Sequence, residues 1–404
     1  MAKKIFIAAT GRDIGKTSIS LGLIKSLLSK ELRVGYIKPI AQRYVKVENN
    51  KVSKDVFLIK KIFNFESDLS DMSPCIVERG FTSKYIMGNR KSPKNTILRA
   101  FKKIEKDCDI VIIEGTGHAG VGSVLNLSNA DVAKLLNAPV LIISEGGIGS
   151  TIDHITLNHS LFASCDCSVL GVIINKVKKE KYEEISNLLT KGIKQQNNLE
   201  IFGFIPYRSI LSVPTLSMIK ETLNLKVLNE DNISDLTSIW DEQVDNVLIA
   251  TMEPHVVMET VSASQSKVLI TTSSDRSDIL LAALALYYSK VPNLIGVLLS
   301  GDTPPKSIME VIQKIELPIM LAEQNVYSLA SIIHNLRVKL TQKDETKINI
   351  LTDLFLNYVD YEHLYDAIQN SPEIELTWKE KFRNWLAEVV SLFSYITKSF
   401  FRKT

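Results

Sequence analysis

A series of short, wholly apolar runs in the first half of the chain constrains the fold more than any other feature. The runs are rich in Val and Ile and occupy residues 5–9, 34–37, 110–113, 140–143, 169–174 and 201–205. Strands with one face in water alternate apolar and polar residues, whereas strands buried on both faces are apolar throughout. Because longer helical patterns separate the runs, the sequence predicts an α/β domain with a parallel sheet and helices on both faces.

A second set of strand-like runs follows a break near Pro214 and a polar stretch at residues 229–235. These runs occupy residues 247–249, 268–270, 295–299 and 319–321, with helical patterns at 277–288 and 306–315. Beyond residue 345 no clear strand pattern remains. We therefore expect a first domain over residues 1–215, a smaller α/β domain over 216–345 and a helical tail over 346–404.

The expected tail carries apolar residues at helical spacing from Phe382 to Phe400, followed by Arg402 and Lys403. This pattern predicts a helix with one apolar face. Such a face packs on its own or a neighbouring subunit, or it lies on a membrane surface beside its basic end. Before the tail, no stretch reaches the ~18 apolar residues of a membrane span, so we expect none.

Composition narrows the class of protein. The net charge is +3 from 48 basic and 45 acidic residues, which gives no strong attraction to nucleic acid. The four cysteines form neither a CxxC pair nor a metal-type spacing; they are Cys75, Cys108, Cys165 and Cys167. The apolar run at residues 5–9 is too short for a signal peptide. We therefore expect a protein of the reducing cytoplasm.

The strongest functional motif is TGRDIGKT at residues 10–17, between the first predicted strand and a helical pattern. Its glycines let backbone N–H groups turn toward phosphate oxygens, and the helix start adds partial positive charge. Lys16 would bind the β- and γ-phosphates of a nucleoside triphosphate, and Thr17 would offer its hydroxyl to Mg²⁺. The expected nucleotide-binding residues here are Gly11, Arg12, Asp13, Gly15, Lys16, Thr17 and Ser18. Thr10 replaces the usual first glycine, and a plain strand–turn–helix junction is the alternative.

Two carboxylates are candidate magnesium ligands. Glu114 ends a predicted strand, and the carboxyl ends of parallel strands meet beside the phosphate loop. Asp55 opens the helical pattern at residues 54–62. Mg²⁺ prefers oxygen ligands and usually takes one or two carboxylates, so these two acids with Thr17 form a suitable set. Taken alone, Glu114 also fits a helix or turn cap, and Asp55 fits an N-cap.

Two further polar residues end strands at the same predicted edge. Lys38 ends the second strand, where a cation could hold a γ-phosphate or an anionic acceptor, or could be a solvated surface lysine. Asn175 ends the strand at residues 169–174, and its amide can donate and accept as an adenine edge requires. A plain loop asparagine is the alternative.

Together, the motifs match a family. TGRDIGKTSISLGL, YIKPIAQ, KDVFLIK, EGTGHAGVGSV, NAPVLIIS, GVIINKV and FGFIPY occur in this order. Residues 1–215 thus resemble the dethiobiotin-synthetase-like (BioD-like) P-loop ATPase domain at the N-terminus of long bacterial phosphate acetyltransferases and in stand-alone BioD-like phosphotransacetylase family proteins. SDRSDI at 274–279 and GDTPP at 301–305 resemble the DRTGG domain that follows it. The two resemblances cover about 345 residues, and the tail matches no named family.

The resemblance implies roles for these residues. Lys16 and Thr17 would bind phosphates and metal, Asp55 and Glu114 would hold Mg²⁺, and Asn175 would read the adenine of ATP. Lys38 would lie in the acceptor pocket and, with Lys16, would be catalytic. Gln42 stands near the position where dethiobiotin synthetases carry a substrate-binding hydroxyl residue, and His118 alters the glycine-rich turn. These departures favour a substrate other than the diamine.

Two functions remain open. The first is a nucleotide-dependent regulatory or sensor protein, in which the second domain and tail bind a partner or a second copy of the chain. The second is an ATP-dependent ligase that phosphorylates a carboxylate or carbamate near Lys38. Fewer than sixty residues follow residue 345, so we expect no acetyl transfer, and the cysteine positions disfavour glutamine-dependent amidation. Asp275, Arg276 and Asp278 would bind a small anion or form a salt bridge, and we expect a homo-oligomer.

Overall fold

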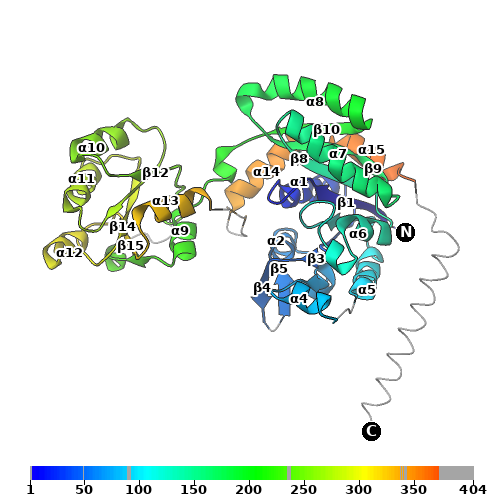
Figure 1. The fold of residues 1–404 in the computed structure, drawn as a ribbon, viewed down its shortest axis with the longest axis horizontal. Coiled ribbons are helices and arrows are strands. Elements are labelled where there is room, and N and C mark those ends of the chain that lie inside the picture. Colours follow the sequence, from blue (N-terminus) through cyan, green and yellow to red (C-terminus); the bar gives the residue numbers. More distant parts are fainter. Residues whose placement is uncertain are drawn as a thin grey trace, which may run out of the picture. The chain divides into compact units, whose positions relative to one another are not determined.

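The computed structural model describes residues 2–48, 50–88, 92–233, 238–336, 338, 340 and 344–372, and it forms two compact units (Figure 1). Among the described residues, unit 1 contains those up to 207 together with residues 340 and 344–372. Unit 2 contains residues 208–339 and therefore interrupts unit 1 in the sequence. The face at 382–400 predicted from the sequence lies outside the described residues.

Unit 1 is built on a six-stranded sheet of order β10-β9-β8-β1-β7-β2. Every neighbouring pair in this sheet is parallel, as the apolar runs predict. The strands are β1 Lys3–Ala9, β2 Val34–Ile37, β7 Ile110–Glu114, β8 Val140–Glu145, β9 Val169–Val177 and β10 Glu200–Pro206. β7 and most of β1 and β8 are fully buried, because helices cover both faces.

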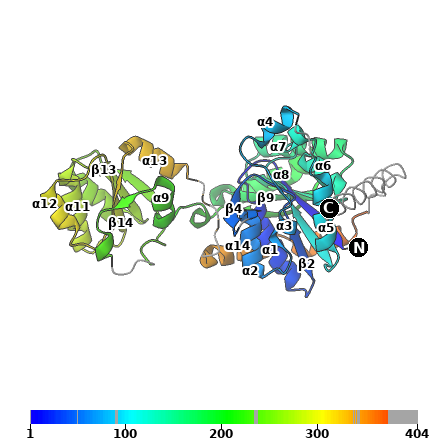
Figure 2. The ribbon, with the colours of Figure 1, turned by 90° about the horizontal axis from the view of Figure 1, so that it is seen from below.

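The direction of each crossover between strands determines which face of the six-stranded sheet its helix covers. The crossover from β1 to β2 runs across the sheet in one direction and the later crossovers run in the other, so right-handed connections place their helices on opposite faces. Figure 2 shows α1 on one face and α7 and α8 on the other. The helices of these connections are α1 Lys16–Leu28, α5 Lys94–Glu105, α6 Asn129–Leu135, α7 Gly149–Ser164 and α8 Tyr182–Asn197.

Two helices that follow unit 2 in the sequence complete the α1 face. They are α14 Glu345–Tyr358 and α15 Tyr361–Gln369. α14 contacts α1 and β10, and α15 contacts β1 and β10. Lys30 at the end of α1 forms a 2.6 Å ion pair with Glu362 of α15. The described part of the expected tail is therefore an integral layer of unit 1 and not a separate region.

Short elements between β2 and β7 position the second half of the site. A two-stranded antiparallel hairpin, β4 with β5, leads directly into α2. A second pair, β3 with β6, is parallel. These elements are β3 Ile40–Ala41, β4 Tyr44–Val47, β5 Asn50–Ser53, α2 Lys54–Phe63, α3 Leu69–Met72, β6 Cys75–Ile76 and α4 Phe81–Ile86.

Unit 2 is a smaller α/β unit on a five-stranded sheet of order β11-β15-β14-β13-β12. β12 to β15 are parallel, and the short edge strand β11 is antiparallel to β15. The strands are β11 Lys226–Val227, β12 Asn246–Ile249, β13 Val268–Ser273, β14 Leu294–Ser300 and β15 Ile319–Ala322. The four parallel strands follow the sequence prediction, whereas two residues of β11 are too few to show a period.

Helices cover both faces of the second sheet. α10 Pro254–Ala263, α11 Ser277–Tyr288 and α12 Lys306–Ile312 pack into one apolar cluster. α9 Leu216–Leu223 and α13 Val326–His334 pack into the cluster on the other face. α12 ends before the predicted residue 315, at the turn that leads into β15.

The unit boundaries differ by a few residues from the expected domain limits at 215 and 345. Thr215 pairs with Gln243 and caps α9 through its hydroxyl, so the turn around Pro214 belongs to unit 2. Within the described residues, no helix is both long enough and apolar enough to cross a membrane.

Candidate functional site

The loop from Thr10 to Gly15 joins β1 to α1 and has a backbone that few sequences could adopt. Gly15 has φ +110°, and a Cβ there would lie 2.2 Å from Nδ2 of Asn175. Asp13 also has positive φ, at +57°. Glycine at position 15 is therefore required both by the left-handed conformation and by the close approach of Asn175.

Lys16 points back into the loop that precedes it. Its Nζ donates hydrogen bonds to the carbonyl oxygens of Gly11, at 3.2 Å, and of Gly117, at 3.1 Å. The side chain is 8% exposed, and burial together with the charge of Lys38 lowers its pKa to about 8. A buried ammonium with only carbonyl partners is poorly compensated, so this position favours an incoming anion.

Glu114 at the end of β7 is fully buried and accepts hydrogen bonds from several elements. Its Oε1 accepts from Thr17 Oγ1 at 3.0 Å. Its Oε2 accepts from Ser20 Oγ at 3.0 Å and from the Tyr36 hydroxyl at 2.9 Å. Burial and the charge of Glu114 hold the pKa of Tyr36 well above its ordinary value, so this hydroxyl remains a donor. The carboxylate is thus fixed from α1 and β2 at once.

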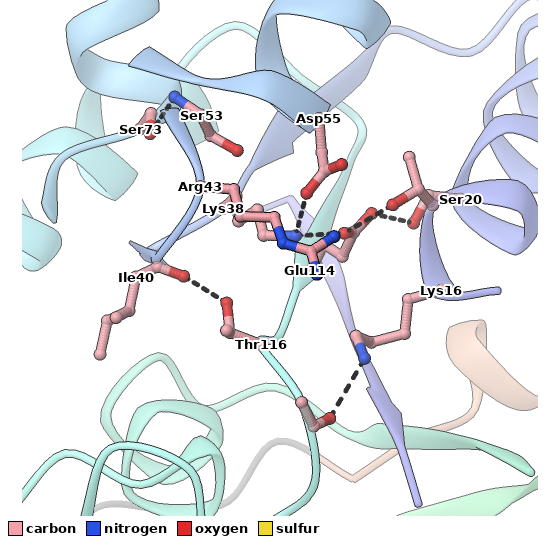
Figure 3. Close-up of polar contacts among 12 residues, drawn as sticks. Lys16, Ser20, Lys38, Ile40, Arg43, Ser53, Asp55, Ser73, Glu114 and Thr116 are labelled. Atoms are coloured by element: carbon pink, nitrogen blue, oxygen red, sulfur yellow. Dashed lines mark hydrogen bonds and ion pairs between the residues drawn. The ribbon is translucent and has the colours of Figure 1, made fainter. Parts of the chain in front are cut away.

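Lys38 lies between the two acids that the sequence nominates as metal ligands (Figure 3). Its Nζ is 2.6 Å from Asp55 Oδ2 and 2.6 Å from Glu114 Oε1. Burial alone would lower the pKa of Lys38, but the two carboxylates outweigh burial and raise it above its ordinary value. Lys38 is 6% exposed, so it is a buried, charged and paired lysine, in contrast to a solvated surface lysine.

Asp55 is the second residue of α2, and the N-cap position is Ser53. The hairpin of β4 and β5 delivers the helix start to this point, and the Ser53 N–H donates to Ser73 Oγ at 3.2 Å. Asp55 is therefore directed at Lys38 by the fold and is not at the N-cap position. Oxygen atoms of Asp55, Glu114 and Thr17 all lie in the Lys38 network.

Asn175 braces the phosphate loop. Its Nδ2 donates to the Ile14 carbonyl at 2.7 Å, and its Oδ1 accepts from the Lys176 N–H at 2.9 Å. Lys176 contacts the loop too, through a 2.8 Å bond from Nζ to the Asp13 carbonyl. These contacts use one donor hydrogen and one lone pair of the Asn175 amide.

The remaining expected loop residues lie at the rim. Arg12 donates to Gln42 Oε1 at 3.3 Å, and Asp13 lies 3.6 Å from a guanidinium nitrogen of Arg43. Ser18 is half-buried in the first turn of α1. The sequence analysis did not predict Arg43 as a site residue. Its position shortly after Lys38 was the signal that it could lie at this rim.

Asn129 is a second residue that sequence reasoning missed. Its Oδ1 accepts from the Thr116 N–H at 3.1 Å, and its Nδ2 donates to the carbonyls of Thr116 at 2.8 Å and His118 at 2.7 Å. This clamp fixes residues 116–118, whose Gly117 carbonyl accepts from Lys16. The available signal was a polar residue in the first turn of α6, which the structure buries.

The donor set suits a hard divalent cation. Asp55 and Glu114 contact one and the same nitrogen of Lys38, so a single ion could reach both carboxylates. Thr17 adds a hydroxyl at Glu114. An all-oxygen set with two carboxylates is typical of Mg²⁺, which takes its other ligands from water and phosphate. Among the described residues, no group of three or more His, Cys, Asp or Glu side chains is arranged so that it could hold a metal ion.

Comparison with known proteins identifies the architecture. The family model described as an AAA domain matches residues 3–215, which is more than half of the chain. The chain belongs to this family. A DRTGG domain model matches residues 219–336, so the arrangement is a BioD-like P-loop domain followed by a DRTGG domain, as the sequence motifs predict.

Curated relatives of this family agree. A phosphate acetyltransferase of Nitrosomonas europaea is 26% identical over 373 residues, covering 89% of this chain and 51% of the relative. An ATP-dependent dethiobiotin synthetase BioD of Brachyspira hyodysenteriae is 31% identical over 218 residues, covering 51% of this chain and 92% of the relative. The chain spans about half the length of the phosphate acetyltransferases it matches.

Among solved structures, the MinD cell division protein of Aquifex aeolicus aligns with 52% of this chain and 84% of its own. The TM-score is 0.33 at 17% identity. This likeness is too slight to support any statement about function.

Proposed function

We propose that unit 1 binds a nucleoside triphosphate with Mg²⁺ and that the bound nucleotide sets the conformation of a regulatory or sensor protein. The observation that carries this proposal is the position of Lys16, whose ammonium spans the phosphate loop and the loop after β7 through the carbonyls of Gly11 and Gly117. This one side chain couples the place where phosphates would bind to a second segment.

Phosphate oxygens carry charge, so they bind an ammonium more strongly than carbonyl oxygens do. A nucleotide would therefore draw Lys16 away from Gly117 and remove a hydrogen bond from the loop after β7. Asn129 holds the same loop through three hydrogen bonds, and this keeps its conformation defined. The occupancy of the phosphate loop would thus be transmitted to residues 115–118.

Within this proposal, the bound nucleotide is ATP and the bound cation is Mg²⁺. The Brachyspira relative is by its name ATP-dependent, and it matches this chain over nearly its whole length. The Asn175 amide at the phosphate loop can donate to and accept from a base edge, and Asp55, Glu114 and Thr17 offer the oxygen set described above. When bound, Mg²⁺ would neutralise phosphate charge at this edge of the sheet.

A second candidate function is an ATP-dependent ligase that phosphorylates a carboxylate or carbamate. The named relative supports it, as does the convergence of Lys16 and Lys38 near the phosphate loop. In such a reaction the protein positions the reactants and neutralises charge, and it needs no covalent nucleophile. In this case ATP turnover would rise when the acceptor is added.

The role of unit 2 also stays a proposal. Arg276 makes a bidentate ion pair with Asp278 at 2.9 and 2.8 Å, which is the salt-bridge alternative for this motif. Binding of a small anion there would have to compete with Asp278. A homo-oligomer and the lack of acetyl transfer remain predictions, which sedimentation and a coupled acetyl phosphate assay would test.

Hydrogen exchange with and without Mg·ATP tests the regulatory proposal. Exchange of the amides at residues 115–118 should change when a non-hydrolysable ATP analogue binds. The rate of ATP hydrolysis is measured in a separate experiment. An analogue that binds without altering these amides would contradict the proposed coupling. Turnover that an added carboxylate or diamine accelerates would favour the ligase.

A further inference from the structure

The two carboxylates of the metal set are both occupied by one side chain of the protein itself. Lys38 Nζ lies 2.6 Å from an oxygen of each acid, and the Glu114 atom it contacts is Oε1. Thr17 Oγ1 donates to the same Oε1 atom. Any cation that binds Glu114 Oε1 beside Thr17 must therefore take the place of this ammonium.

An ammonium and a divalent cation cannot share this position. Both are attracted by Asp55 and Glu114, and within hydrogen-bond distance of the same oxygens they would repel each other strongly in a buried site. Lys16 adds another positive charge nearby, and Lys38 contributes to lowering the pKa of Lys16. The site without phosphates thus already holds as much positive charge as its two acids can balance.

We propose that Lys38 is a built-in occupant of the metal site, which keeps divalent cations out until nucleotide phosphates arrive. The phosphates would supply the negative charge and the extra oxygen ligands that let Mg²⁺ displace the ammonium. The displaced ammonium would then be available to an anion at the carboxyl edge of the sheet. The phosphate step rests on the proposed nucleotide binding, whereas the exclusion of free cations does not.

The surroundings of Lys38 separate this role from that of a structural ion pair. Glu114 already accepts hydrogen bonds from Thr17, Ser20 and Tyr36, so its oxygens do not depend on the lysine for donors. Lys38 directly follows β2 and Asp55 lies in α2, and the two meet beside Glu114. Glu114 therefore keeps hydrogen-bond donors on both oxygens without the lysine, so a different cation can replace Lys38 while this carboxylate stays in place.

Manganese binding in the absence of nucleotide tests the proposal. Free Mn²⁺ gives a six-line electron paramagnetic resonance signal that is lost on binding. The wild type should leave this signal unchanged, whereas Lys38→Met should bind a single Mn²⁺ per chain and release it to excess Mg²⁺. Lys38→Met with Asp55→Asn should lose the binding again, because one ligand is removed.

Lys4→Met is the matched control. Lys4 is a partly buried lysine of β1 in the same unit, and it pairs with Glu105 at 3.1 Å away from the phosphate loop. Its removal should create no manganese site. Circular dichroism would establish that each variant is folded, and Lys38→Gln replaces Lys38→Met if the methionine variant is not.

Saturable Mn²⁺ binding by the wild type without nucleotide would overturn the proposal, and this measurement needs no variant. Folded Lys38 variants that bind no Mn²⁺ would overturn it as well. A wild type that binds Mg·ATP while the variants ignore Mn²⁺ would refute the inference alone. Variants that gain Mn²⁺ while the wild type binds no nucleotide would refute the proposed function alone.

Discussion

Phe355 of α14 packs into the space that Gly22 leaves on α1. A Cβ at Gly22 would lie 2.3 Å from Cγ of Phe355 and 2.4 Å from its Cβ. Phe355 is 1% exposed, and it belongs to a helix that lies beyond both matched family domains. The helix that begins at the phosphate loop is thus shaped to receive a segment encoded more than three hundred residues later.

Gly22→Ala should therefore destabilise unit 1. In a helix interior this change usually stabilises by about 0.5–1 kcal/mol, but here the new methyl group overlaps an aromatic ring. The expected cost is about 1–3 kcal/mol, as for overpacking elsewhere. Urea unfolding measures it, and a gain in stability would show that α14 does not pack on α1 in this way.

A double-mutant cycle supplies the control. Phe355→Ala alone should cost about 3–5 kcal/mol through the cavity it leaves. In that background Gly22→Ala no longer meets a ring but still meets the Cβ of residue 355, so its cost should be smaller than in the wild type. Equal effects of Gly22→Ala in both backgrounds would mean that the two residues do not interact.

The lowered pKa of Lys16 predicts that the free energy of unfolding depends on pH. Its pKa falls from 10.5 in the unfolded chain to about 8 in the fold, so between these values the unfolded state binds more protons. Stability should therefore rise with pH across this window, by about 3 kcal/mol in total. The penalty is complete below pH 8 and absent above pH 10.5.

Comparison with Lys16→Met isolates this contribution from other groups. The wild type should gain stability relative to the variant as the pH rises from 8 to 10.5. A difference in stability between the wild type and Lys16→Met that is independent of pH would contradict the lowered pKa of the buried Lys16 ammonium.

Lys38 should behave in the opposite way. Since the pKa of Lys38 is raised by Glu114 and Asp55, its contribution is complete below its unfolded pKa and is lost only as the pH rises through the folded value. Lys38→Met should cost about 3–5 kcal/mol near neutral pH, because it leaves the buried Glu114 and the partly buried Asp55 without their cation. Thermal unfolding measures this loss, and added Mn²⁺ should restore part of it. A variant as stable as the wild type would contradict the buried network.

Asn129→Asp is a nearly isosteric test of the clamp on the loop after β7. The new carboxylate can still accept from the Thr116 N–H, but it would face the carbonyls of Thr116 and His118 without hydrogens to donate. We expect a loss of about 1–3 kcal/mol in stability and faster hydrogen exchange at residues 116–118. Unchanged exchange there would show that the clamp does not hold the loop.

The sequence predicted those parts of the site that depend on local pattern. Strand ends and the glycine-lysine-threonine loop are local features, and parallel topology brings the ends of β1, β2 and β7 to one edge. Lys38, Asp55 and Glu114 could therefore be nominated separately. Their mutual contact could not, because it depends on the hairpin before α2, whose short strands carry no clear period.

The layer that α14 and α15 add to unit 1 could not be predicted from the sequence, for a different reason. Once the strand order is known, right-handed crossovers leave α1 as the connecting helix on its face, so something else must cover β9 and β10. The apolar pattern of residues 345–369 does not say which surface it covers. In the structure, Gly22 leaves room for Phe355, and Gly203 leaves room for the backbone at Tyr358 and Val359. Nothing in the sequence distinguishes these two glycines from others.

Thermal unfolding with and without Mg·ATP, for the wild type and for Lys16→Ala, shows whether the loop at residues 10–17 binds a nucleotide. Ligand at 100 times its dissociation constant should stabilise the wild type by about 2.7 kcal/mol, and the same concentration should leave Lys16→Ala unchanged. That result would establish the phosphate loop as a working nucleotide site. If neither ATP nor GTP stabilises the wild type, or if the variant responds equally, the account of this loop is wrong.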